Sequence, residues 1–124
     1  MLDASTILAL IHQEPGSDKL PLELLVNASA STVNLAEVQG KLVSKGWTPD
    51  EAWQDATGVV EQVIPFTAEH AKSAGTLISQ TRSLGLSLGD RACLALALEL
   101  NAPVYTSDRS WKNLKVGVRI HVIR

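Results

Sequence analysis

Apolar and polar positions along this chain alternate between two kinds of pattern. Short apolar stretches typical of buried strands occur at 1–3, 28–32, 62–66, 103–106 and 116–123. Helical patterns occupy 5–12, 17–26, 34–45, 48–61, 67–78 and 90–100. Because strands and helices alternate in this way, we predict a three-layer α/β/α sandwich with a mostly parallel sheet of about five strands.

Several residues mark where these elements begin and end. Thr48 followed by Pro49 is typical of a helix start, with a capping hydroxyl and a proline at the first helical position. Thr32 or Asn34 is expected to cap the third helix. Pro65 lacks a backbone donor, which favours an edge position for the strand at 62–66.

The helix predicted from Asp90 to Leu100 is apolar around most of its circumference, so we expect it to be buried. Asn101 and Pro103 end it. Cys93, the one cysteine of the chain, lies among its alanines and leucines and cannot form an internal disulfide. We interpret it as a buried, inert thiol.

Composition indicates one globular domain over residues 1–124. Hydrophobic residues make up 45% of the chain and charged residues 19%, which is ordinary for a folded protein and excludes disorder. No apolar run approaches the roughly 20 residues of a membrane span. The first residues include no basic segment, so we expect no signal peptide and a cytoplasmic protein.

The charge is distributed unevenly along the chain. The net charge is −2, which argues against a broadly basic nucleic-acid binder. Residues 1–81 contain four Lys/Arg and ten Asp/Glu, whereas residues 82–124 contain seven and three. A basic C-terminal third is compatible with a face that binds a polyanion, and equally with a solvated edge that has no partner.

Four acidic residues fall at related places in the predicted topology. Asp3 ends the first strand, Glu37 lies one turn into the helix after the second, Asp90 opens the buried helix, and Asp108 follows the fourth strand. Sites of open α/β sheets form beyond the carboxyl ends of strands, so these side chains are expected on one rim. Converging carboxylates repel unless a cation neutralises them. Mg²⁺ or Mn²⁺ suits such oxygen ligands, and no His/Cys grouping favours zinc.

Each of these acids also has a purely structural interpretation. Asp3 can cap the first helix, and Glu37 can be a solvated helix residue. Ser87 and Asp90 fit a capping box, and Asp108 can cap the short turn after it. Taken singly, none of the four is a specific signal. The hypothesis of a metal site therefore depends on their conjunction.

Four segments of the chain together resemble the PIN-domain ribonucleases, and most closely the VapC-type toxins of bacterial toxin–antitoxin pairs. These segments are LDAS at 2–5, STVNLAE at 31–37, LSLGDRACLALA at 86–97 and VYTSDRSW at 104–111. The resemblance covers essentially the whole chain. In one respect the chain departs from the family, because only Met1 and Leu2 precede Asp3 in a first strand that is usually longer.

The resemblance implies a set of site residues. The family's catalytic acids correspond to Asp3, Glu37, Asp90 and Asp108. The three aspartates are expected to hold Mg²⁺ or Mn²⁺ directly or through water, and Glu37 to act either as a ligand or as a base that orients water. Ser5 and Thr106 correspond to supporting hydroxyls beside the site. Thr106 is expected to hydrogen-bond a metal-bound water or a carboxylate.

The resemblance also implies an activity and partners. The chain would be an endoribonuclease toxin that cleaves RNA phosphodiester bonds with metal-activated water, leaving a 5′-phosphate and a 3′-hydroxyl. A cognate antitoxin and a homodimer are implied as partners. Arg91 and Arg109 each follow a site aspartate, so they are candidates for RNA contact, while pairing with the neighbouring aspartate is an equal alternative.

Two other interpretations stay open at this point. A PIN-like domain can have become a non-catalytic binding or regulatory module, although the presence of all four acids argues against it. A phosphotransfer enzyme or receiver domain also places an aspartate at the end of a strand. The run Asp3-Ala4-Ser5 lacks the second aspartate of the phosphatase motif, which disfavours that class.

Overall fold

A parallel sheet runs through the computed structural model, which describes residues 1–124. Its strands are β1 (Ser29–Ser31), β2 (Gln62–Ile64), β3 (Val104–Thr106) and β4 (Ile120–Val122). β1 pairs with β2 and β3 with β4, both in parallel. Residues 1–3 join the two pairs, because Leu2 N donates to Ser29 O at 3.0 Å and Asp3 N to Tyr105 O at 3.3 Å. The spatial order is therefore β2, β1, residues 1–3, β3, β4.

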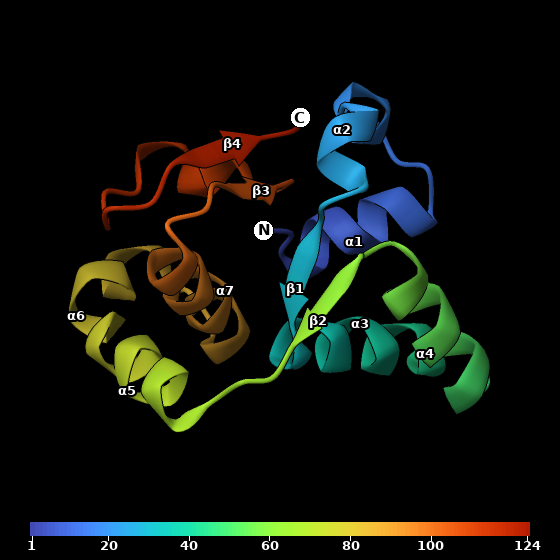
Figure 1. Cartoon of the computed structure of the whole chain (residues 1–124), viewed down its shortest axis with the longest axis horizontal. Coiled ribbons are helices and arrows are strands. Elements are labelled where there is room, and N and C mark those ends of the chain that lie inside the picture. The colour runs from blue at the N-terminus through green and yellow to red at the C-terminus, as the bar shows by residue number, and fades with distance from the viewer.

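Helices cover both faces of this sheet, as predicted. On one side lie α1 (Ala4–Ile11), α2 (Leu22–Leu25), α3 (Thr32–Ser44) and α4 (Pro49–Gly58) (Figure 1). On the other side lie α5 (Ala68–Thr76), α6 (Ile78–Thr81) and α7 (Leu88–Leu100) (Figure 1). Short 3₁₀ turns complete the chain: η1 (Ser17–Lys19), η2 (Arg82–Leu84) and η3 (Arg109–Asn113). No helix has the length and apolar character needed to cross a bilayer.

The core is divided between the two faces of the sheet. Met1 belongs to the apolar cluster under α7 and α5, whereas its neighbour Leu2 belongs to the cluster under α1, α3 and α4. Val104 and Tyr105 divide in the same way. This alternation follows from the pleat, which points successive side chains to opposite faces. The N-terminal segment is thus a central strand in its packing, although it is only three residues long.

Local signals placed most helix ends correctly. Thr48 caps α4 by accepting from Glu51 N, and Thr67 caps α5. The predicted cap of α3 was wrong: Ser31 accepts from Val33 N, and the Thr32 hydroxyl instead accepts from Phe66 N at 3.1 Å. The helix predicted at 17–26 is broken into η1 and α2, because Pro21 has a fixed φ and no N–H to donate.

Strand order reverses at the N-terminal segment. From there β1 and β2 extend the sheet to one side, and β3 and β4 extend it to the other. Crevices form beyond the carboxyl ends of parallel strands at such a switch point. Asp3 ends the central segment, and Thr106 ends the strand beside it. The topology therefore predicts a binding site around these two residues.

Candidate active site

The Asp3 carboxylate is buried, with only 3% of the residue exposed, and it is surrounded by donors. Its Oδ1 caps α1 by accepting from Thr6 N at 2.9 Å. The Ser5 hydroxyl lies 2.8 Å from Oδ1 and donates to the carboxylate. The Thr106 hydroxyl donates to Oδ2 at 2.6 Å. We call this arrangement of Asp3, Ser5, Thr6 and Thr106 the Asp3 cage.

The cage also fixes the chain that leaves β3. Thr106 Oγ1 accepts from Asp108 N at 3.0 Å, and Ser5 Oγ accepts from Ser107 N at 3.0 Å. Two hydroxyls predicted as supporting residues thus tie the central segment to the turn that carries Asp108. Burial raises the pKa of Asp3 above its ordinary value, and the hydrogen bonds from Thr106, Thr6 and Ser5 oppose that rise.

Glu37 and Asp90 meet where α3 crosses the start of α7. Glu37 packs against Gly89 so closely that a Cβ on that glycine would lie 1.4 Å from Glu37 Oε1. Asn34, one turn earlier on α3 and 1% exposed, donates from Nδ2 to Gly89 O at 3.0 Å. We call Asn34, Glu37, Gly89 and Asp90 the α3–α7 contact. The absence of a side chain on Gly89 leaves room for Glu37, and the hydrogen bond from Asn34 holds α3 against the first turn of α7.

The carboxylates repel one another across this contact. The pKa of Glu37 is raised first by partial burial and then by the negative charge of Asp90. Lys41 partly offsets this rise, and the charge of Asp3 adds a smaller rise. The same three acids raise the pKa of the Cys93 thiol, after its complete burial. Cys93 is therefore the inert core thiol that the sequence predicts. Three of the four predicted acids share one electrostatic field.

Asp90 and Asp108 also have the structural roles considered above. Asp90 Oδ2 accepts from Ser87 N at 2.9 Å while Ser87 Oγ accepts from Asp90 N at 3.1 Å, which is a complete capping box. Asp108 Oδ1 caps η3 by accepting from Ser110 N. Asp108 is linked to Asp3 only through Thr106. Asp90 thus stabilises the start of α7, and Asp108 stabilises the start of η3.

The candidate acids do not by themselves enclose a metal ion. No three His, Cys, Asp or Glu side chains lie within reach of a single ion in this arrangement, so there is no closed protein cage. Mg²⁺ commonly uses one or two carboxylates and keeps several waters. Burial and then the charge of Asp90 raise the pKa of Glu37, with Lys41 opposing them, and such an ion would relieve the repulsion between the two carboxylates.

The two candidate arginines lie in different surroundings. Arg91 donates from Nη1 to Ala74 O at 2.9 Å, so its side chain ties α7 to α5. Arg109 is exposed on η3 and lines a surface hollow beside β4. Of the two, only Arg109 presents its guanidinium to an open surface.

Sequence reasoning missed two residues of the α3–α7 contact. Asn34 was expected only as a possible cap, and Gly89 was given no role of its own. Gly89 carries no local signal, since its φ is negative and any residue could adopt it. Their importance comes from a contact between residues 55 positions apart, which periodicity cannot specify.

Comparison with known proteins gives one matching family and many solved structures of similar fold. The family model of the PIN domain matches residues 1–117. No protein of curated function is matched by the sequence.

Solved structures with the same fold come from bacterial toxin–antitoxin systems. VapBC2 of Rickettsia felis, bound to promoter DNA, is 24% identical, with a TM-score of 0.73 over 98% of this chain and 96% of that one. DNA-bound VapBC of Salmonella typhimurium is 19% identical, with a TM-score of 0.76 over 100% and 97%. The sarcin-ricin loop-cleaving toxin VapC20 of Mycobacterium tuberculosis is 20% identical, with a TM-score of 0.71 over 95% and 97%.

Proposed function

This chain belongs to the PIN domain family, and from that premise we propose that it is a Mg²⁺- or Mn²⁺-dependent endoribonuclease acting as the toxin of a toxin–antitoxin pair. The observation that carries the proposal is the approach of Glu37 to the first turn of α7, where burial and the negative charges of Asp90 and Asp3 raise its pKa. These acids come from three segments that are distant in the sequence, and the charge of Lys41 only partly offsets their repulsion.

The acids would hold the ion in the roles that the sequence predicts. Asp3, Asp90 and Asp108 are the proposed ligands, directly or through water, and Glu37 is a further ligand or a base that orients the attacking water. When bound, the ion supplies positive charge that makes water a better nucleophile and offsets charge on the phosphodiester. The Asp3 cage keeps its carboxylate in one orientation, which reduces the reorganisation needed to bind a cation.

The reaction is a hydrolysis of the RNA backbone. Water oxygen forms a bond to phosphorus as the bond from phosphorus to O3′ breaks, and O3′ takes up a proton. The products carry a 5′-phosphate and a 3′-hydroxyl. Glu37 is suited to accept the proton of the attacking water, because a glutamate with a raised pKa is a stronger base than an ordinary glutamate.

The proposed partners are an antitoxin and a second copy of the chain. Support for the antitoxin comes from the solved relatives, several of which are complexes of a VapC-type toxin with its antitoxin. Co-expression with the protein of the adjacent reading frame should relieve growth arrest caused by this chain. Sedimentation of the purified protein would measure whether it forms a homodimer.

A pair of variants separates the chemical role of Asp90 from its capping role. Asp90→Asn removes the charge but keeps an oxygen that can accept from Ser87 N, whereas Ser87→Ala removes half of the capping box and keeps the charge. We expect Asp90→Asn to abolish Mg²⁺-dependent RNA cleavage with little loss of stability. Ser87→Ala should lose about 0.5–2 kcal/mol of stability and keep its activity.

Undiminished cleavage by Asp90→Asn would overturn the assignment of the site. If the wild-type protein cleaves no RNA with Mg²⁺ or Mn²⁺ and causes no growth arrest, the chain is instead a non-catalytic PIN-like binding module. Sequencing the RNA ends produced during brief expression would identify the bond that is cut.

A further inference from the structure

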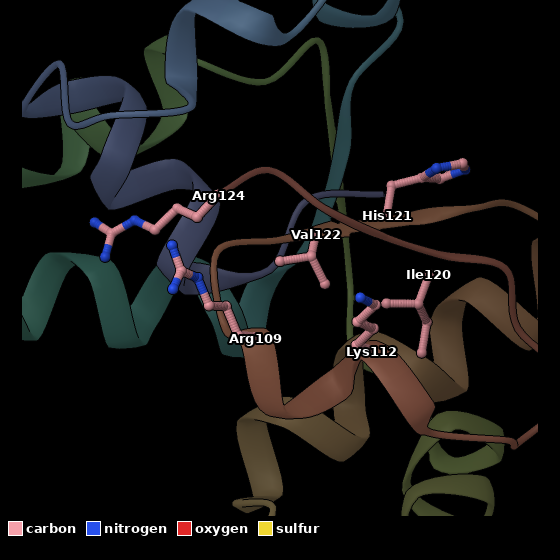
Figure 2. A pocket seen from close by; sticks show the side chains of 6 residues that line it. All are labelled: Arg109, Lys112, Ile120, His121, Val122 and Arg124. Atoms are coloured by element: carbon pink, nitrogen blue, oxygen red, sulfur yellow. The ribbon is translucent and has the colours of Figure 1, made fainter.

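Two hollows adjoin on the surface beside β4, and both are lined by basic side chains. The larger, of about 590 Å³, is lined by Arg109, Lys112, Ile120, His121, Val122 and Arg124. The smaller, of about 420 Å³, shares Arg109 and Arg124 and adds Lys19 on η1. Figure 2 shows the guanidinium groups of Arg109 and Arg124 extending in the same direction, with Lys112 between Arg109 and Ile120. We call the joined hollows the basic groove.

The groove is strongly positive in a chain whose net charge is negative. Neither hollow has an acidic residue in its lining. Arg124 pairs with Glu14, which takes up part of the charge of Arg124. Arg109, Lys112 and Lys19 make no ion pair. The groove is therefore lined by three cationic side chains that take part in no ion pair.

The walls of the groove are held in place by buried contacts. Arg109 and Lys112 lie on η3, which is capped by Asp108 and anchored by the fully buried Trp111. The opposite wall turns at Gly16, where a Cβ would lie 2.1 Å from Ile123 O. Such close packing fixes η1 against the end of β4. Because the walls are fixed, binding there would order little further backbone.

The groove begins directly beside the candidate active site. Arg109 follows Asp108, whose backbone N–H is bound to the Thr106 hydroxyl of the Asp3 cage. Asp108 follows the end of β3 and Arg124 follows the end of the parallel strand β4, so Asp108 and this part of the groove lie beyond the same ends of the sheet. A chain of phosphates in the groove would run toward the acids, and a single small anion would fill only part of it.

We propose that the basic groove binds the sugar–phosphate backbone of the RNA on one side of the cleaved bond. This inference rests on the proposed function, since it takes RNA as the substrate of the same site. Arg109 and Lys112 contact phosphates nearest the acids, and Lys19 contacts phosphates farther along the strand. These contacts carry no base specificity and set the direction of the strand across the acids.

Binding of a short mixed-sequence single-stranded RNA, followed by fluorescence anisotropy in EDTA at several salt concentrations, tests the groove without cleavage. In the variant Arg109→Gln/Lys112→Gln, affinity at low salt should fall about tenfold or more, and the slope of log K against log salt should decrease by about 1.4. Lys19→Gln should decrease the slope by about 0.7. The control Lys72→Gln/Arg82→Gln removes two exposed charges on α5 and η2 and should leave both quantities unchanged.

The outcomes distinguish the groove from the proposed function. If the wild-type protein cleaves RNA but the groove variants bind it as tightly as the control does, the groove proposal fails and the function stands. If the wild-type protein neither binds nor cleaves RNA, both fail. Competition by a glutamate homopolymer as strong as that by RNA of equal charge would assign the groove to an acidic protein segment and overturn the RNA assignment. Melting curves verify that each variant is folded.

Discussion

The Asp3 cage and the α3–α7 contact hold carboxylates in opposite ways. In the cage, one buried carboxylate accepts from two hydroxyls and a backbone N–H, so its charge is solvated by the protein. In the α3–α7 contact, the small size of Gly89 and the hydrogen bond from the Asn34 side chain bring Glu37 close to Asp90. No hydrogen-bond donor lies between these two carboxylates. The Asp3 carboxylate has its hydrogen-bond donors within the cage, whereas Glu37 and Asp90 repel each other in a way that an added cation would relieve.

This difference indicates that the two regions have different roles. A caged carboxylate is fixed in position before any ligand arrives, and it contributes orientation. A repelling pair contributes attraction for a cation, at the expense of stability in its absence. The two regions should therefore respond differently to substitution: the cage mainly in stability, and the α3–α7 contact mainly in activity.

Among substitutions that keep all four acids, the largest effect on activity is expected from Gly89→Ala. The new Cβ would overlap Glu37 Oε1, and because that atom ends a flexible side chain, Glu37 would swing away while the helices stay packed. RNA cleavage should fall about a hundredfold, as expected for a displaced catalytic group. Stability measured by urea unfolding should change by less than about 1 kcal/mol.

Gly40→Ala is the matched control for this substitution. It lies on the same helix α3 as Glu37, and a Cβ there meets nothing within 4 Å. It should keep full activity. Full activity of Gly89→Ala as well would show that the position of Glu37 does not matter, and the α3–α7 contact would lose its proposed role.

A smaller effect, mainly on stability, is expected from Thr106→Val. The fully buried hydroxyl is lost, so Asp3 Oδ2 and Asp108 N are both left without this partner. The free energy of unfolding should fall by about 1–3 kcal/mol at neutral pH. Thr106→Ser, which restores the hydroxyl, should recover most of this loss. A Thr106→Val protein as stable as the wild type would mean that the cage does not stabilise the fold.

The smallest effect is expected in the pH dependence of stability. The pKa values of Asp3 and Glu37 are raised above 3.8 and 4.5, so the folded protein binds these protons more tightly than the unfolded chain does. Their contribution is fully present below the ordinary values and is lost as pH rises through the raised ones. Urea midpoints measured across this window should therefore decline less steeply with pH in Asp3→Asn and in Glu37→Gln than in the wild type. Parallel curves for all three proteins would contradict the raised pKa values.

Much of the fold was predictable because its signals are local. The alternation of strand and helix patterns, the capping box of Ser87 and Asp90, and the start of α4 at Thr48 all depend on residues within three or four positions of one another. The single helix predicted at 17–26 was wrong, because the leucine pattern does not show that the chain breaks at Pro21. The family resemblance of the four motifs is confirmed by the match to the PIN domain model.

The sequence by itself determined the architecture and the likeness to a family, and it supplied the four candidate acids. Tertiary structure alone decided which of them share a field, and it brought Asn34 to Gly89, Thr106 to Asp3 and the turn at Gly16 to the end of β4. The reason is physical. Periodicity shows which face of an element is buried, but the register in which two faces pack depends on side-chain shapes from both. Contacts between residues 55 or 103 positions apart are set by that register, and the candidate site consists of such contacts.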